Sequence, residues 1–125
     1  MADLVTSQTI LSLPSRAVFL FTNVSDGTGE SAVQKIDISA LDGSPQAVNI
    51  KKIWYNTFGM AVKVISDHAT DTTAIVLQGD GQFNFESFGG IPDRGATLGD
   101  PGDILFTTVG HTSGDTYSIL IEIGW

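Results

Sequence analysis

The chain has no cysteine among its 125 residues, which excludes disulfide bonds, thiolate nucleophiles and cysteine-ligated metals. Basic residues are also scarce. Six lysines and arginines stand against fourteen aspartates and glutamates, and the formal net charge is −8. Domains that bind nucleic acid or anionic membrane surfaces need a basic face, so we expect neither partner. The acidic balance predicts a protein kept soluble by self-repulsion.

Long apolar runs are missing as well. No run approaches the about 20 residues that a membrane-spanning helix needs, so we expect no integral membrane protein. The opening MADLVTSQTI places an acidic residue where a secretory signal needs basic ones, which predicts synthesis in a cytosol. The apolar fraction of 42% supports a packed core. Residues 1–125 are therefore expected to form a single domain.

Helical periodicity is almost absent, and alternation of apolar and polar residues recurs in its place. Glycine, at fourteen residues, and β-branched residues are frequent, which is typical of an all-β chain. We predict a single-domain antiparallel β-sandwich of jelly-roll or immunoglobulin-like type with about eight strands, and a barrel is the alternative. The predicted strands cover residues 4–11, 17–25, 32–41, 47–55, 60–66, 73–78, 82–88, 103–110 and 115–125.

Turn residues divide these strands. We expect a break near Gly59 and a hairpin turn at Gly79-Asp80-Gly81, because Gly-Asp-Gly favours the positive backbone angles of tight hairpins. Between 47 and 55, Trp54 shares the alternation of Val48 and Ile50. This pattern predicts that Trp54 faces the core and Tyr55 faces outward.

The C-terminal sequence DTYSILIEIGW alternates strictly and ends on tryptophan. We predict that this strand pairs within a sheet with Ile119, Ile121 and Ile123 in the core. Trp125 then either closes the end of the core or packs against a neighbouring subunit, since tryptophan is enriched at interfaces.

Two segments are candidates for contact with other subunits. The aperiodic stretch 88–103 is either a long functional loop or a solvated crossover between two sheets. Residues 1–12 are a possible N-terminal arm that could add a strand to a neighbour. The predicted interface residues are Leu4, Val5, Ile91, Pro92, Arg94, Leu98 and Trp125.

Residue types of a catalytic triad occur at His111, Ser113 and Asp115, but all three lie within one tight turn. A triad needs its base between nucleophile and acid, usually from separate elements, so we expect these side chains to bond turn backbone instead. The only other histidine is His68, next to Asp67. We assign no catalytic residue, no metal ligand and no cofactor.

Two weaker alternatives stay open at this stage. Acidic oxygens around Asp26 and Glu30, and again around Asp100 and Asp103, suit calcium, but neither stretch matches an EF-hand loop and turn acids are the favoured interpretation. The aromatic cluster Trp54, Tyr55 and Phe58 would suit a sugar-stacking platform, as in a carbohydrate-binding module.

Several segments together resemble one family. MADLVTSQTIL, FTNVSDGTGESAVQKIDISAL, IKKIWYNTFGMAV and GDILFTTVGHTSGDTYSILIEIGW are similar to small virion structural proteins of tailed bacteriophages. The resemblance implies a non-enzymatic subunit of the virion, assembled in the host cytoplasm. Its expected role is capsid decoration (cement), as a homo-oligomer, with a trimer favoured, on the major capsid protein or other virion proteins. A place in the neck, tail or fibre is the alternative.

Overall fold

The computed structural model describes residues 4–38, 41, 48–67, 72–92 and 103–125, and these form antiparallel strands with one short 3-10 helix. The all-β prediction is confirmed. None of the residues described forms a helix long and apolar enough to span a membrane. The elements are β1 (Leu4–Leu13), β2 (Arg16–Val24), β3 (Val33–Ile36), β4 (Asn49–Ser66), β5 (Thr72–Asn84), η2 (Glu86–Phe88), β6 (Ile91–Pro92), β7 (Ile104–Val109) and β8 (Thr116–Gly124).

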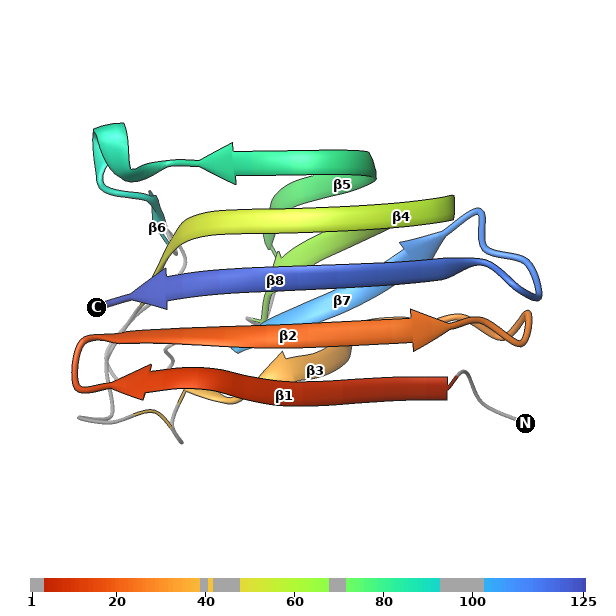
Figure 1. Ribbon diagram of the computed structural model, residues 1–125, viewed down its shortest axis with the longest axis horizontal. Helices are drawn as coiled ribbons and strands as arrows, with labels where there is room; N and C mark the ends of the chain where they lie inside the picture. Colours follow the sequence, from red (N-terminus) through yellow and green to blue (C-terminus); the bar gives the residue numbers. More distant parts are fainter. Residues whose placement is uncertain (1–3, 39–40, 42–47, 68–71, 93–102) are drawn as a thin grey trace.

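The strands form one sheet in the order β1-β2-β8-β4-β7-β3, and β5 and β6 also pair with β4. The sheet curls back until its two end strands, β1 and β3, lie on the same side of the molecule (Figure 1). The result is a nearly closed, barrel-like sheet. In the front part β1, β2, β8 and the first half of β4 lie side by side, and we call this part, with the second half of β5, the front sheet.

Two of the predicted turns are wrong. β4 continues through Gly59, and β5 continues through Gly79-Asp80-Gly81, so four predicted strands are two long ones. The pairing jumps from Asn56↔Asp80 to Ala61↔Gln78, which places residues 57–60 of β4 opposite Gly79 alone. The positive φ angles of 78° at Gly59 and 88° at Gly79 therefore serve a β-bulge. Glycine permits the same backbone angles in a bulge as in a turn.

The bulge folds the β4–β5 hairpin over, so that its two halves have different neighbours. The first half of β4 pairs with β8 and the second half pairs with β7. The core lies between the halves. There the rings of Phe21 of β2 and Phe106 of β7 pack edge to face, with 5.3 Å between their centroids. The most deeply buried apolar side chains include Phe21, Ile53, Val62, Val64, Leu77, Ile104, Phe106, Ile119, Ile121 and Ile123.

The prediction for the C-terminal strand is confirmed. β8 lies between β2 and β4 along its whole length, and Ile119, Ile121 and Ile123 are each 0% exposed. Trp125 packs against the core as a partly buried side chain, and its backbone N–H donates to the Ser15 carbonyl oxygen at 3.0 Å. The end of the chain is thus tied to the β1–β2 turn.

The structure describes only part of the segments predicted as an N-terminal arm and a long loop. From Leu4 onward the N-terminal segment is β1 and pairs with β2 in the domain's own sheet. In the stretch 88–103, Ile91 and Pro92 form β6 against Asn49 and Ile50 of β4. Residues 93–102 lie outside the described part of the chain. The strand predicted over 32–41 is shorter, since β3 ends at Ile36.

Candidate subunit interface

The outward face of the front sheet presents apolar side chains in register across its strands. Leu20 of β2 lies opposite Leu120 of β8, and Leu120 lies opposite Trp54 of β4. All three side chains are partly exposed, while their sequence neighbours Ile121 and Ile53 are fully buried on the other face. The row is completed at its ends by Gln8 of β1 and Gln82 of β5. We call Gln8, Leu20, Leu120, Trp54 and Gln82 the outer row.

The structure therefore corrects the placement of Trp54. Alternation from Val48 and Ile50 predicted a core position, but the register between β4 and β8 shifts between Ile50 and Lys52. One extra residue in a strand moves every later side chain to the opposite face. Ile53 takes the core position, and Tyr55 turns inward and stacks on Phe83 with 5.5 Å between ring centroids.

The outer row borders a shallow hollow of about 280 Å³. Its floor and rim combine the apolar side chains of the row with the neutral polar residues of the adjacent row, Asn56 and Ser118. None of the described residues that line it is charged. A broad, uncharged, partly apolar surface of this kind fits contact with another macromolecule, because the cores of protein interfaces are depleted of charge.

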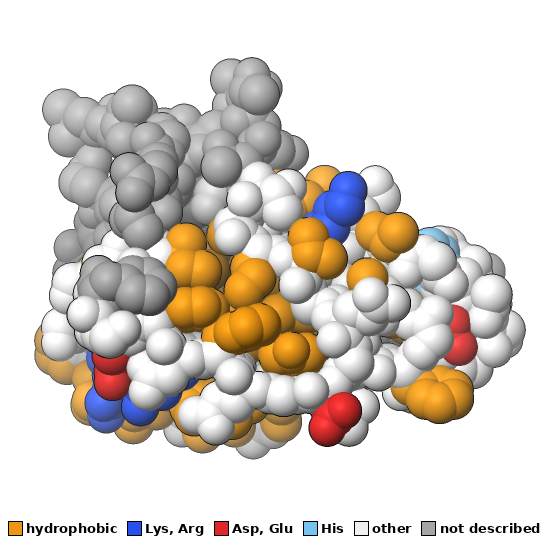
Figure 2. Space-filling view, turned by 90° about the horizontal axis from the view of Figure 1, so that it is seen from above, with side chains coloured by type: hydrophobic (Ala, Val, Ile, Leu, Met, Phe, Trp, Pro, Cys, Tyr) orange, Lys and Arg blue, Asp and Glu red, His pale blue; other side chains and the backbone are white. Residues whose placement is uncertain are grey.

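Basic residues gather at one end of the front sheet. A second cavity of about 250 Å³ is lined by Arg16, Lys51, Glu86, Glu122 and Trp125, among others. Figure 2 shows Lys or Arg side chains beside Asp or Glu side chains at one corner of the molecule. Lys51 Nζ donates to the Gly89 carbonyl oxygen at 2.7 Å, so part of this charge holds the segment after η2 in place.

Figure 2 also shows hydrophobic side chains gathered over the side of the molecule where β5 lies. Three rings stack there, with Tyr55, Phe83 and Phe85 spaced 5.5 and 5.6 Å between centroids. All three pack against the core as partly buried residues. This stack closes the side of the core next to β5, so it has a role in folding.

The predicted interface residues fall in different places. Val5 of β1 is 37% exposed, and Leu4 begins the same strand. Ile91 packs against the core, and Pro92 pairs through β6. Trp125 is partly buried, and its indole Nε1 atom is inaccessible and has no hydrogen-bond partner among the described residues. The remaining two predicted residues, Arg94 and Leu98, lie outside the described residues.

Sequence reasoning missed a buried polar cluster around Glu30, made of Asn23, Glu30, Lys35, Thr108 and Tyr117. Lys35 Nζ lies 2.5 Å from Glu30 Oε2, with both side chains under 5% exposed. Glu30 Oε1 accepts hydrogen bonds from Tyr117 Oη at 2.5 Å and from Asn23 Nδ2 at 3.2 Å. The Glu30 backbone N–H donates to Thr108 Oγ1 at 2.9 Å.

This Glu30 cluster ties the β2–β3 connection to β7 and β8. The lysine ammonium also lies 5.8 Å from the centroid of the Phe106 ring, within reach of a cation–π contact. A buried carboxylate needs both a counter-charge and hydrogen-bond donors, and Glu30 has them inside the fold. The cluster therefore stabilises the fold by holding the β2–β3 connection against β7 and β8.

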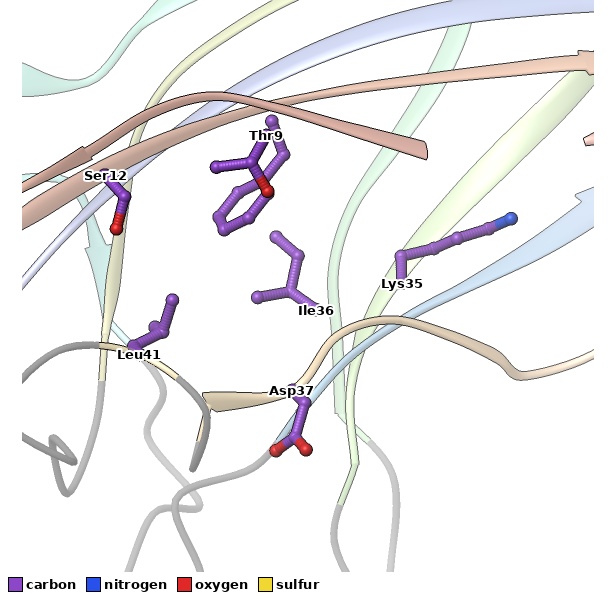
Figure 3. Close-up of a pocket in the computed structure, with 7 residues that line it drawn as sticks. Thr9, Ser12, Lys35, Ile36, Asp37 and Leu41 are labelled. Atoms are coloured by element: carbon purple, nitrogen blue, oxygen red, sulfur yellow. The ribbon is translucent and has the colours of Figure 1, made fainter. Parts of the chain in front are cut away.

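A cleft of about 220 Å³ separates the end strands β1 and β3. Figure 3 shows Thr9 and Ser12 of β1 on one side, Ile36 projecting between them and Asp37, and the Lys35 ammonium directed away from the cleft. That direction is consistent with its pairing to Glu30. The cleft is the seam at which the barrel-like sheet stays open.

The turn before β8 behaves as predicted for Asp115. Its Oδ2 atom accepts from the Thr112 backbone N–H at 2.7 Å and from Thr112 Oγ1 at 3.0 Å. His111 Nε2 donates to the Thr28 carbonyl oxygen at 3.1 Å, and its Nδ1 lies 3.1 Å from Thr108 Oγ1. His68 lies outside the described residues.

The acids considered for calcium also have partners. Asp26 Oδ1 accepts from the Thr28 N–H at 2.9 Å, and Asp103 Oδ1 accepts from the Ile38 N–H at 2.9 Å. The described residues hold no group of three or more acidic, histidine or cysteine side chains spaced to bind a metal ion. Asp100 lies outside them.

No protein-family profile matches the chain, and no curated protein is significantly similar to it. Kinship with phage virion proteins therefore stays a prediction from the sequence segments quoted above.

Proposed function

We propose that this chain is a non-enzymatic structural protein of a bacteriophage virion and acts as a capsid decoration (cement) protein through contacts with other subunits. The observation on which this depends is the outer row, where Leu20, Leu120 and Trp54 lie partly exposed across three neighbouring strands. Apolar patches on a protein surface mark sites of contact with other macromolecules.

The rest of the proposal follows from the resemblance. The subunit assembles in the host cytoplasm, binds the major capsid protein or another virion protein, and forms a homo-oligomer, with a trimer favoured. Many copies on one shell add contact area between capsid subunits, and several modest contacts per oligomer supply avidity. The proposal includes the sandwich architecture of jelly-roll or immunoglobulin-like type, with the folded β4–β5 hairpin joining two packed sheets.

The direct test is immunogold labelling of purified virions with antibody against this chain. Label over the whole head is the expected result. Label at one vertex or along a tail would move the same fold to the neck or tail. Absence of label from every particle would contradict a virion role.

A binding assay on particles stripped of the protein tests the surface itself. Trp54→Ala should weaken re-binding by about 2 kcal/mol or more, the scale of an interface hot spot. Val76→Ala is the matched control, because Val76 is an exposed strand residue, at 51%, outside the outer row. Equal binding by both variants would remove the outer row from the proposal.

A carbohydrate-binding module is the second candidate, and the outward position of Trp54 favours it. Its ring borders the hollow together with Asn56 and Ser118, so an apolar surface lies beside hydrogen-bonding groups as sugars require. A reproducible glycan-array signal that Trp54→Ala abolishes would support this function. A blank array would leave the structural role alone.

A further inference from the structure

The outer edge of β1, the side turned away from β2, has no partner strand among the described residues. β1 stands at one end of the strand order and lies along the margin of the front sheet (Figure 1). It is ten residues long, and every residue from Val5 to Leu13 except Leu11 is exposed. Such an edge presents a row of backbone N–H and C=O groups to whatever strand approaches it.

β1 lacks most features that protect strand edges. Its sequence, LVTSQTILSL, contains no charged residue, no proline and no glycine. Proteins usually guard an edge with lysine, proline, shortness or a bulge, and only an irregularity between Thr9 and Leu11 is present here. A chain with a net charge of −8 thus has ten consecutive uncharged residues at its edge.

Exposed apolar side chains concentrate on the same hairpin. Val5, Ile10 and Leu13 of β1 are 37%, 49% and 40% exposed. Val24 of β2, which lies opposite Leu4, is 46% exposed. These are four of the eight large hydrophobic residues found exposed in the described chain. An extended strand that paired with this edge would satisfy its backbone N–H and C=O groups and bury its apolar side chains at the same time.

We propose that a second copy of this chain covers the edge, with β1 pairing antiparallel to β1 of the partner about a two-fold axis. The inference rests on the proposed function as a subunit that works through protein contacts. It names one such contact, which gives a two-fold dimer in place of the trimer that the resemblance favours. The two front sheets then continue across the joint, and their outward faces with the outer rows become one surface.

The charge distribution favours a second copy as the occupant. Two acidic molecules repel each other, and an edge strand with no charge is a place where identical copies approach without opposing like charges. Antiparallel pairing of identical strands is compatible with a two-fold axis and closes at two copies, so it leaves neither β1 edge open for further growth.

Cysteine scanning tests the pairing directly, because the natural chain has no cysteine. Single cysteines replace in turn Val5, Gln8, Thr9 and Ser12, and Val76→Cys on β5 is the control. A two-fold axis brings only the central position against its own copy, so crosslinking should peak at Gln8 or Thr9 and fall toward both ends. Equal crosslinking along β1 would overturn the two-fold arrangement, and equal crosslinking at Val76 would overturn the choice of edge.

Sedimentation equilibrium of the full chain tests the association itself. The unmodified protein should show a concentration-dependent dimer, and Ile10→Lys should weaken it on the order of tenfold or more by placing charges from two copies along one joint. Leu13→Lys repeats the test at the other end of β1, and Val76→Lys should leave the dimer unchanged. A purely monomeric unmodified chain, or a dimer indifferent to both β1 variants, overturns the proposal. Neither outcome bears on virion labelling.

Discussion

β1 and β3 are the two ends of the strand order, and each pairs with one neighbour among the described strands. β3 has four residues against the ten of β1, and its register with β7 shifts between Gln34 and Ile36. Its lysine, Lys35, points into the molecule and pairs with Glu30. Shortness, an irregular register and an inward charge are all features that keep a strand edge from pairing. β1 has only the irregularity.

This difference separates two sources of stability. The β3 edge is protected from within the chain, because the Lys35 side chain is buried in its ion pair with Glu30 and Ile36 is 2% exposed. The outer edge of β1 has no partner strand among the described residues, and in our proposal a second copy covers it. Substitutions of the buried side chains of β3 should therefore reduce the free energy of unfolding, whereas substitutions at β1 should reduce association and leave folding intact.

The largest effect is expected from breaking the ion pair at β3. Lys35→Met leaves the Glu30 carboxylate buried without its counter-charge, which should lower the free energy of unfolding by about 3–5 kcal/mol. Urea unfolding followed by circular dichroism measures the loss. Lys63→Met is the control, since Lys63 is exposed on β4. If Lys35→Met lowers the free energy of unfolding no more than Lys63→Met does, the Glu30 cluster does not stabilise the fold.

The same truncation at both ends of the sheet compares them directly. Ile36→Ala removes a side chain that is 2% exposed and should cost about 2–5 kcal/mol through lost burial and a cavity. Ile10→Ala, at 49% exposed, should change the free energy of unfolding by about 0.5 kcal/mol or less. Thermal unfolding at low protein concentration measures both. Similar losses at the two positions would mean that β1 is held as firmly as β3.

A smaller loss is expected when one donor to Glu30 is removed. Tyr117→Phe deletes the hydroxyl that bonds Glu30 Oε1 at 2.5 Å, and hydrogen bonds to charged groups contribute about 1.5–3 kcal/mol. Asn23 still donates to the same oxygen, which favours the lower end of this range. Tyr55→Phe is the matched control on the stacked rings of β4 and β5. Comparable losses for both tyrosines in urea unfolding would show that the hydroxyl of Tyr117 has no special role.

Alternation predicted the strands that have regular register. β8 follows the pattern from Thr116 to Gly124 because it lies between two strands and no bulge interrupts it on the β2 side. The same reasoning failed in β4 and β5. A glycine with positive φ fits a hairpin turn or a bulge equally well. The strand pairing decides between them, because β4 and β5 pair on both sides of the glycines, at Asn56↔Asp80 and at Ala61↔Gln78.

The candidate interface was predictable only in part. Val5 and the N-terminal segment were predicted as contact sites from the sequence, and the structure shows only that Val5 is exposed on β1. Trp54 was placed on the wrong face because a register shift after Ile50 leaves no mark in composition. The Glu30 cluster gave no local signal either. No sequence pattern links Glu30 to Lys35 or to Tyr117. Their side chains meet only because the β2–β3 connection crosses β7 and β8 in the folded chain.

The smallest expected effect is that of Ile10→Lys on folding, and it tests whether β1 contributes to the stability of its own chain. The side chain is half exposed on an edge strand, so a lysine there can extend into water and the free energy of unfolding should change by about 0.5 kcal/mol or less. Urea unfolding of dilute protein, where dimer is absent, measures this term apart from association. The matched substitution on β3 is Val33→Lys, at 39% exposed, which should behave alike in folding. A loss above about 1 kcal/mol for Ile10→Lys alone would mean that β1 packs within its own chain, and the edge would then not be reserved for a partner.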